Sequence, residues 1–146
     1  KDLSEGAFRP VIDDPKGAEK RQAVKRLIVC SGKVYYDLLA AGIPESVAVV
    51  RVEELYPWPH EEIARTVDLY PHIDEVAWVQ EEPKNMGAWT FVAPRLRVST
   101  GNALVIRYYG RPERASPAEG YPSAHTEEQT RIVTEALSAP RIRSLP

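Results

Sequence analysis

The chain has 146 residues, a formal net charge of −2 and one cysteine, Cys30. This length suits a single domain that buries a core without disulfide or metal staples. The charge gives no electrostatic basis for binding nucleic acid or an anionic membrane. A single cysteine excludes an internal disulfide and is typical of a reducing compartment. No apolar run has the length of a membrane span, and the amino-terminal residues lack the apolar segment of a signal peptide.

Apolar runs alternate along the chain with segments of helical periodicity. The pattern predicts strands at 24–30, 47–52, 75–79 and 103–109. It predicts helices at 33–41, 59–70 and 88–98, the last interrupted near Pro94, and a final helix that begins at Thr126 with a capping box to Gln129. A helix between successive strands indicates the α/β class, with a mostly parallel sheet covered by helices on both faces in three layers.

The ends of the chain are predicted to lie outside the main domain. Residues 1–22 are polar and contain Pro10, Pro15 and Gly17, which favours a lead-in or linker with a short extended piece at 8–12. The α/β domain is expected at 23–140, and residues 141–146 are expected to form a tail. The chain does not begin with Met, which is typical of a fragment or a processed chain.

Polar loops follow several predicted strands, where α/β proteins gather their ligands. Ser31-Gly32-Lys33 sits at a strand-to-helix turn that favours anions, although no P-loop or Gly-rich dinucleotide motif is present. The alternative is a tight turn with a solvated lysine. The longest such junction is the stretch 80–89, which leads from a strand through two carboxylates, a lysine, an asparagine and a glycine into a helix.

Paired carboxylates follow two strands that are expected to be neighbours. Glu53-Glu54 and Glu81-Glu82 could serve acid–base chemistry or hold a metal. Ion pairing to Arg51, Lys84 or Arg107 is the interpretation that we favour, because structural networks produce the same clusters.

The remaining candidates do not complete a catalytic or metal-binding set. The histidines are scattered, and His125 is expected to close the loop before Thr126. Arg95, Arg107, Arg111 and their basic neighbours either converge on a phosphate or carboxylate, or form a solvated face. The residues alone therefore predict no catalytic residue and no metal ligand in this chain.

Several long motifs resemble the C-terminal domain of the first, thiamine diphosphate-dependent component of 2-oxoglutarate dehydrogenase. The resemblance covers about residues 8–138 and is carried by the stretches 27–38, 51–59, 80–89, 108–111, 115–118 and 125–129. Many motifs in one order are far more specific than a lone Gly-rich match. The Arg-Pro-Glu-Arg run at 111–114 and Met86 resemble the bacterial branch that carries a fused succinyltransferase-like region.

The resemblance implies a transketolase C-terminal fold with a mixed five-stranded sheet. It implies that the whole enzyme decarboxylates 2-oxoglutarate on thiamine diphosphate with Mg²⁺, both bound in preceding domains, in the bacterial cytoplasm. The succinyl group then passes to a lipoyl domain of dihydrolipoyl succinyltransferase. The implied roles of this domain are support of the homodimer and, in some relatives, binding of acetyl-CoA or AMP as effectors.

We therefore expect an assembly or regulatory domain that is inactive alone and has the rest of the enzyme chain and a homodimer mate as partners. The alternative is a freestanding regulatory module that binds a nucleotide or acyl-CoA. An effector anion is expected at Ser31, Lys33, Arg95, Arg111 and Arg114. Interface or structural roles are expected at Glu81, Glu82, Lys84, Trp89 and His125.

Overall fold

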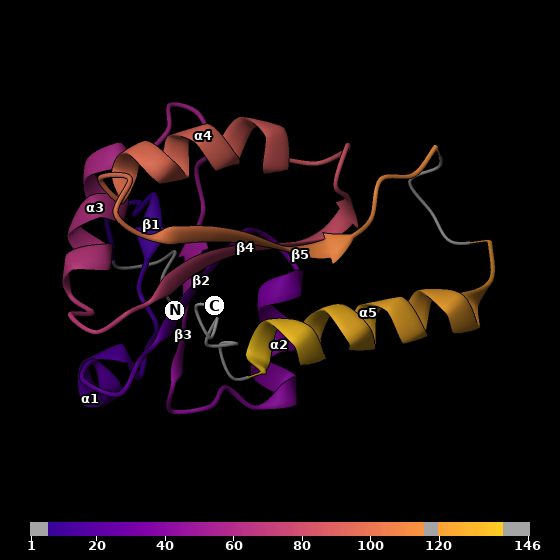
Figure 1. Ribbon diagram of the computed structural model, residues 1–146, viewed down its shortest axis with the longest axis horizontal. Helices are drawn as coiled ribbons and strands as arrows, with labels where there is room; N and C mark the ends of the chain where they lie inside the picture. Colours follow the sequence, from indigo (N-terminus) through magenta and orange to yellow (C-terminus); the bar gives the residue numbers. More distant parts are fainter. Residues whose placement is uncertain (1–5, 116–119, 139–146) are drawn as a thin grey trace, which may run out of the picture.

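The computed structural model describes residues 6–115 and 120–138, and these form a five-stranded sheet with helices on both faces (Figure 1). The strand order across the sheet is β1-β3-β2-β4-β5. The strands are β1 (Val11–Ile12), β2 (Arg26–Cys30), β3 (Val47–Val52), β4 (Glu75–Pro83) and β5 (Val105–Arg111). The helices are α1 (Gly17–Lys20), α2 (Val34–Ala41), α3 (His60–Asp68), α4 (Trp89–Ser99) and α5 (Pro122–Leu137).

The three central strands are apolar on both faces, which separates the core into two layers. In β2, Leu27 and Val29 belong to one buried cluster, and Ile28 and Cys30 belong to the other. This is the period of two that a strand imposes on its side chains. Helices α3 and α4 cover the first cluster, and α2 and α5 cover the second (Figure 1). The three-layer α/β architecture is thus confirmed.

All neighbouring strands are parallel except β1, which pairs antiparallel with β3. The expectation of a mixed but mostly parallel five-stranded sheet is confirmed. Parallel strands end at the same edge of the sheet, so the loops after β2, β3 and β4 share one side of the molecule. That carboxyl edge lies on the right in Figure 1.

The segment expected to be a lead-in contributes the fifth strand of this sheet. Downstream of β1, Asp14 and Lys20 are buried and form an ion pair of 3.1 Å. Asp14 also accepts a hydrogen bond from the backbone N–H of Val49 at 3.0 Å, and Lys20 donates to the carbonyl of Val47 at 2.7 Å. Residues 11–20 are therefore fastened to β3 by buried contacts, because each charge finds a partner there.

The last helix begins one turn earlier than the capping box predicts. Helix α5 starts at Pro122, with Tyr121 at its N-cap and no side-chain cap. Thr126 lies inside the helix, where its hydroxyl donates to the carbonyl of Pro122 at 3.1 Å. The capping-box prediction was wrong because Pro122 already has the backbone angle of a first helical residue, and the N–H that it lacks has no helical partner at that position.

Helix α4 continues through Pro94, where an interruption was expected. Pro94 and Thr90, whose carbonyl loses a helical hydrogen bond to the proline, are both exposed. Water can therefore satisfy that carbonyl.

A buried ionic cluster closes the amino edge of the sheet. Arg26 and Arg107 both pair with Glu75, the first residue of β4. Arg26 also donates to the carbonyls of Ala136 and Ser138, each at 2.6 Å, at the end of α5. The cluster therefore ties α5 to the sheet and satisfies two carbonyls that a helix end leaves without partners.

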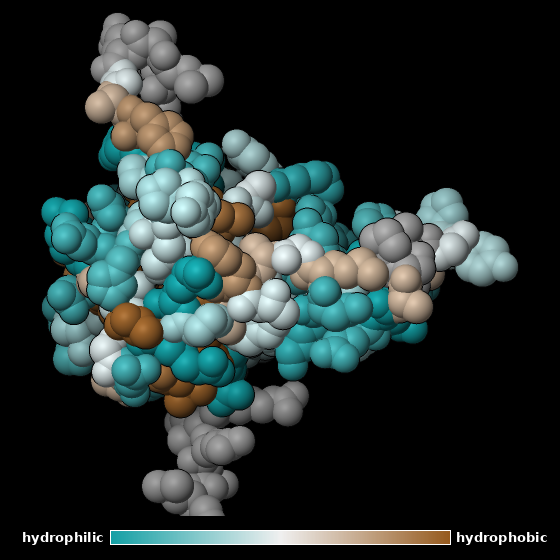
Figure 2. Space-filling model, turned by 90° about the horizontal axis from the view of Figure 1, so that it is seen from above, coloured by the Kyte–Doolittle hydropathy of each residue, from teal (hydrophilic) through white to brown (hydrophobic). Residues whose placement is uncertain are grey.

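The face formed by α3 and α4 is mostly polar (Figure 2). Figure 2 looks onto the side of α3 and α4 and shows hydrophilic residues with separate, smaller apolar areas. Within residues 6–115 and 120–138, no helix has the length and apolar character needed to cross a membrane.

Candidate functional site

The carboxyl edge contains a topological switch point between β2 and β4. After β2 the chain passes to α2 on one face, and after β4 it passes to α4 on the other face (Figure 1). The two strands are direct neighbours, so their connections diverge and leave a crevice beyond their ends. This is the position at which open α/β sheets bind ligands.

Gln80 organises the loop that borders this crevice. Its Oε1 accepts hydrogen bonds from the indole N–H of Trp78 at 2.8 Å and the backbone N–H of Trp89 at 3.1 Å. Its Nε2 donates to three carbonyls of the loop, those of Glu82, Pro83 and Met86. A buried amide with all its groups paired holds the junction in one shape. The stretch 80–89 was predicted to be a polar junction, but the central role of its first residue, Gln80, was not predicted.

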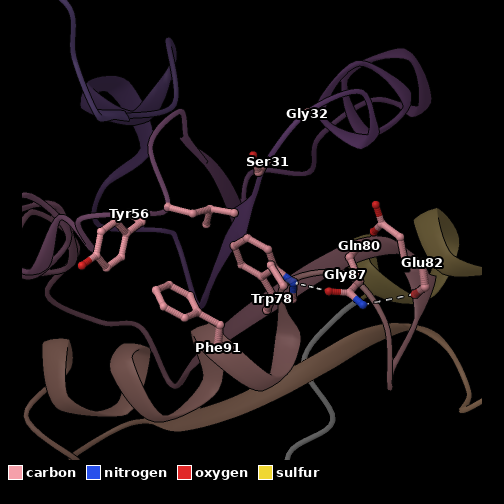
Figure 3. A pocket seen from close by; sticks show the side chains of 10 residues that line it. Ser31, Gly32, Tyr56, Trp78, Gln80, Glu82, Gly87 and Phe91 are labelled. Atoms are coloured by element: carbon pink, nitrogen blue, oxygen red, sulfur yellow. Dashed lines mark hydrogen bonds between the residues drawn. The ribbon is translucent and has the colours of Figure 1, made fainter.

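A cavity of about 570 Å³ opens at the switch point, within the size range of ligand pockets. It is lined by Ser31, Gly32, Leu55, Tyr56, Trp78, Gln80, Glu82, Gly87, Ala88 and Phe91. Figure 3 shows the rings of Tyr56, Trp78 and Phe91 on one side and Glu82 on the other. The cavity is therefore mostly apolar, with few polar groups at its rim.

Gly87 lets the loop pass closely against Glu82. Its φ is +64°, a left-handed conformation that side chains rarely adopt. A Cβ at this position would lie 3.0 Å from Oε2 of Glu82 and 3.1 Å from its Cβ. The glycine therefore leaves room for the Glu82 side chain beside the cavity.

The structure separates the residues that were expected to hold an effector anion. Ser31 lines the cavity, whereas the Nζ of Lys33 lies 3.6 Å from Asp37 and 3.6 Å from Glu81. Arg95 stays on α4, where its guanidinium lies 3.6 Å from the ring centroid of Phe91.

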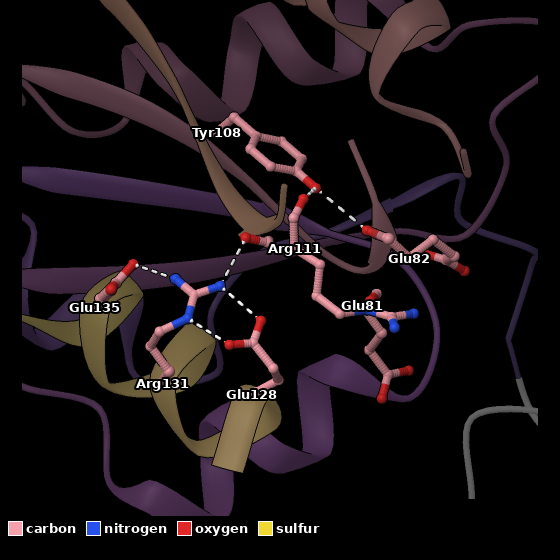
Figure 4. Close-up of polar contacts among 8 residues, drawn as sticks. Glu81, Glu82, Tyr108, Arg111, Glu128, Arg131 and Glu135 are labelled. Carbon is pink, nitrogen blue, oxygen red and sulfur yellow. Dashed lines mark hydrogen bonds and ion pairs between the residues drawn. The ribbon is translucent and has the colours of Figure 1, made fainter. Parts of the chain in front are cut away.

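The two remaining predicted arginines lie beside the 80–89 loop. Arg111 donates from Nε to the carbonyl of Glu81 at 2.8 Å (Figure 4). Arg114 exchanges two hydrogen bonds with the side chain of Asn85 through its backbone. Lys33 and Arg111 thus both contact Glu81, one at the carboxylate and one at the carbonyl.

The paired carboxylates do not form one site. The prediction that they follow neighbouring strands was wrong, because β2 lies between β3 and β4. Glu53 pairs with Arg51 at 3.1 Å, as expected, whereas Glu81 pairs with Lys33. Arg107 pairs with Glu75 at the opposite edge of the sheet. The error arose because strand order was taken from chain order, which a crossover connection changes.

Two interface candidates surround Tyr108 of β5. Trp89 packs against its ring at a centroid distance of 5.1 Å, and the Lys84 ammonium lies 5.8 Å from that centroid. The Tyr108 hydroxyl donates to the carbonyl of Arg111 at 2.8 Å, and burial raises its pKa to about 12. The hydroxyl is therefore protonated at physiological pH, and its hydrogen bond and the contact with Trp89 hold the ring in place.

An ionic network along the middle and second half of α5 was not predicted. The guanidinium of Arg131 bonds the carboxylates of Glu128 and Glu135 and the carbonyl of Gly110 at 3.1 Å (Figure 4). The hydrogen bond from Arg131 lowers the pKa of Glu128. The spacing of three and four residues was a readable signal for these pairs. The bond to Gly110 joins α5 to β5, which no local pattern shows.

Among the described residues, the titratable groups form no reactive set. Burial raises the pKa of Cys30 to about 12, so its thiol stays protonated. His125 is exposed in the first turn of α5, where its backbone N–H bonds the carbonyl of Tyr121. Across the described residues, no group of three or more His, Cys, Asp or Glu side chains is placed to hold a metal ion.

The sheet and the strand order define an α/β domain of the transketolase C-terminal type. Residues 1–137 match the family model described as 2-oxoglutarate dehydrogenase C-terminal. The chain therefore belongs to this family, in agreement with the resemblance read from its motifs.

The curated relatives are 2-oxoglutarate dehydrogenase E1 components of bacteria. The chain is 49% identical over 141 residues to the protein of Exiguobacterium sp. (strain ATCC BAA-1283 / AT1b), with 93% of the chain aligned. It is 46% identical to that of Shouchella clausii, with 93% aligned, and 41% identical to that of Haemophilus influenzae, with 94% aligned. It spans about 15% of the length of each of these relatives.

Proposed function

We propose that the chain serves as the assembly and regulatory domain of a 2-oxoglutarate dehydrogenase and has no turnover of its own. The main observation that supports this proposal is the polar junction around Gln80, whose hydrogen bonds all serve to shape the 80–89 loop. A junction of this kind presents a surface and supplies no base or nucleophile. Similarity to the last part of much longer E1 components supports the same conclusion.

The chemistry of the proposed enzyme belongs outside this domain. When bound, thiamine diphosphate with Mg²⁺ supplies the carbanion stabilisation that decarboxylation of a 2-oxo acid requires. The described residues do not fit that group, because they contain no carboxylate cluster for a metal ion. The succinyl acceptor, a lipoyl domain of dihydrolipoyl succinyltransferase, and the bacterial cytoplasm as the location belong to the same proposal.

Exposed aromatic residues at the carboxyl edge support a role in assembly. Tyr56 follows β3 and is 82% exposed, and Tyr121 at the start of α5 is 75% exposed. Trp89 is half-buried at the start of α4. Aromatic residues of this kind are enriched where proteins contact each other. We place the boundary with the rest of the enzyme or with the homodimer mate at this edge.

Turnover by the isolated chain tests this proposal. The purified chain is incubated with 2-oxoglutarate, thiamine diphosphate and Mg²⁺, and released CO₂ is measured. We expect no CO₂ above the level without protein. Decarboxylation that depends on the chain would overturn the proposal.

The second candidate is a freestanding regulatory module for a nucleotide or acyl-CoA. It is favoured by the position of Ser31 and Gly32 in the cavity wall, at the start of α2, where backbone N–H groups attract anions. Calorimetry of the isolated chain with AMP and with acetyl-CoA separates the two candidates. Micromolar binding would support the module, whereas the absence of heat supports the assembly domain.

A further inference from the structure

The cavity at the switch point has the charge of a cation site. Glu82 is the one charged side chain among the described residues that line it. Its carboxylate makes no hydrogen bond or ion pair within residues 6–115 and 120–138, although the side chain rests against Gly87. A carboxylate beside an apolar cavity attracts a positive charge or hydrogen-bond donors and repels a phosphate.

Two basic residues on the helices that border the cavity already have partners. Lys33, at the start of α2, lies between Asp37 and Glu81 and is 70% exposed. Arg95 donates to the carbonyl of Phe91 at 2.8 Å and stacks on the ring of the same residue. Neither residue belongs to the cavity wall. Because the Glu82 carboxylate has no ion pair within residues 6–115 and 120–138, it is available to a cation that enters from outside.

The aromatic wall is suited to a flat cation. Tyr56, Trp78 and Phe91 contribute rings to the same cavity (Figure 3). Aromatic faces attract cations, and the planar guanidinium stacks on them while its N–H groups donate to a carboxylate. The chain uses this pairing elsewhere, with the guanidinium of Arg51 at 4.6 Å from the ring centroid of Tyr35 and that of Arg26 at 4.9 Å from that of Tyr109.

We propose that this cavity binds an arginine side chain of another polypeptide segment, with the stem on the aromatic wall and the guanidinium at Glu82. Charge complementarity selects a cation over an anion, and the apolar wall selects arginine's long stem and flat head. Tyr56 has an exposed ring at the cavity, and the backbone on either side of the bound arginine would pack against that ring. This inference rests on the proposed function, which supplies the remainder of the enzyme or its homodimer mate as the source of the arginine.

Matched peptides test the chemistry of the cavity directly. The chain is labelled with ¹⁵N, and the indole N–H resonance of Trp78 is followed by NMR during titration. The probes are acetyl-Gly-Arg-Gly-amide and acetyl-Gly-citrulline-Gly-amide, which have nearly the same shape but differ in charge. We expect the citrulline peptide to bind about fivefold to tenfold more weakly, the range of a charge-assisted hydrogen bond at a partly exposed site.

Two glutamine variants identify the carboxylate that causes the difference in affinity between the two peptides. In Glu82→Gln, we expect the two peptides to bind within about twofold of each other, since the carboxylate has gone. Glu81→Gln is the matched control, because Glu81 pairs with Lys33 and does not line the cavity. It should leave the preference for arginine unchanged. Both positions are at least partly exposed, so each variant is expected to fold, which the NMR spectrum verifies.

Several results would overturn the inference. Equal binding of the two peptides to the unaltered chain would do so, as would shifts that leave the cavity residues unaffected. Tighter binding of AMP at the same resonances would identify an anion site. Binding of methylguanidinium as tightly as the arginine peptide would identify a site for a free small cation. None of these results depends on turnover, so failure of the arginine site and failure of the assembly role are distinguishable.

Discussion

Strand β4 has a carboxylate at each end, and the two carboxylates differ in whether the fold supplies their ion-pair partners. At its amino end, Glu75 is buried between Arg26 and Arg107, and Arg26 also binds the end of α5. At its carboxyl end, the Glu82 carboxylate reaches a cavity and meets no partner within the described residues. The first end holds the domain together, and the second end faces outward.

With the proposed arginine site at the carboxyl edge, this difference assigns stability to one edge of the sheet and recognition to the other. A buried charge needs every partner supplied within the fold, because desolvation is costly. A charge beside an open cavity leaves its partner to be supplied by a ligand. Changes to Glu75 and its partners should therefore act on folding, whereas a change to the Glu82 carboxylate should act on binding.

Removal of Arg26 should have the largest effect on stability. Arg26→Ala leaves Glu75 with one arginine and removes the three hydrogen bonds that Arg26 donates to carbonyls at the end of α5. We expect a loss of about 3–5 kcal/mol in the free energy of unfolding, measured with urea. Arg65→Ala is the control, since Arg65 is 71% exposed and should cost no more than about 1 kcal/mol. Equal losses for the two variants would contradict the structural role of the cluster.

Gln80 tests the shape of the carboxyl end. Gln80→Ala removes the acceptor for the Trp78 indole and the donor for three loop carbonyls. The expected loss of unfolding free energy is about 2–3 kcal/mol, the cost of buried polar groups without partners. Gln22→Ala, at an exposed glutamine that contacts His72, should change it by about 0.5 kcal/mol or less. Similar values for both variants would show that the 80–89 loop is not held by this side chain.

A pair of alanine variants distinguishes the cost of backbone strain at Gly87 from the cost of contact with Glu82. Gly87→Ala and Gly101→Ala both place a Cβ at a φ near +65°, with a strain of roughly 1–2 kcal/mol each. Only the alanine at 87 meets another side chain, because nothing lies within 4 Å at Gly101. Urea unfolding should therefore give a larger loss at 87, by about 1 kcal/mol. The same loss at both positions would mean that Glu82 moves aside freely.

Glu128 should have the smallest effect, and it should depend on pH. Because Arg131 lowers the pKa of Glu128 in the folded chain, the stabilisation is present above the ordinary pKa of about 4.5 and is lost as the pH falls through the folded value. Glu128→Gln should cost about 1 kcal/mol or less at pH 7. That difference from the unaltered chain should vanish in acid.

A neighbouring residue controls the pH test. Glu127→Gln alters an exposed carboxylate next to Glu128 and should change the free energy of unfolding at pH 7 by about 0.5 kcal/mol or less. A cost of Glu128→Gln that stays constant from neutral to acidic pH would exclude the ion pair with Arg131 as its source.

The sequence predicted the elements well where the pattern is local. The continuous apolar run 27–30 identifies β2, and the same composition identifies β3 and the first half of β4. Strand order is not local, so the separation of Glu53 from Glu81 by β2 escaped prediction. The start of α5 was misplaced because two valid start signals, Pro122 and Thr126, compete within one turn.

The site was only partly predictable for the same reason. The stretch 80–89 stood out through its charges and its place after a strand. The cavity also needs Tyr56 from the loop after β3 and Phe91 from α4, which only the folded sheet brings together. Buried bonds such as those of Lys20 to β3 and Arg131 to Gly110 depend on pairings of distant residues that a single sequence does not record.

The most direct test of the account is Trp89→Ala in the complete enzyme chain that carries this domain. Dimer formation and thermal stability are measured together with the turnover of the dimers that remain. We expect weaker assembly or lower stability, with turnover per remaining dimer within about twofold of the unaltered enzyme. Intact, equally stable dimers whose turnover falls about tenfold or more would contradict it, because the carboxyl edge would then serve the chemistry.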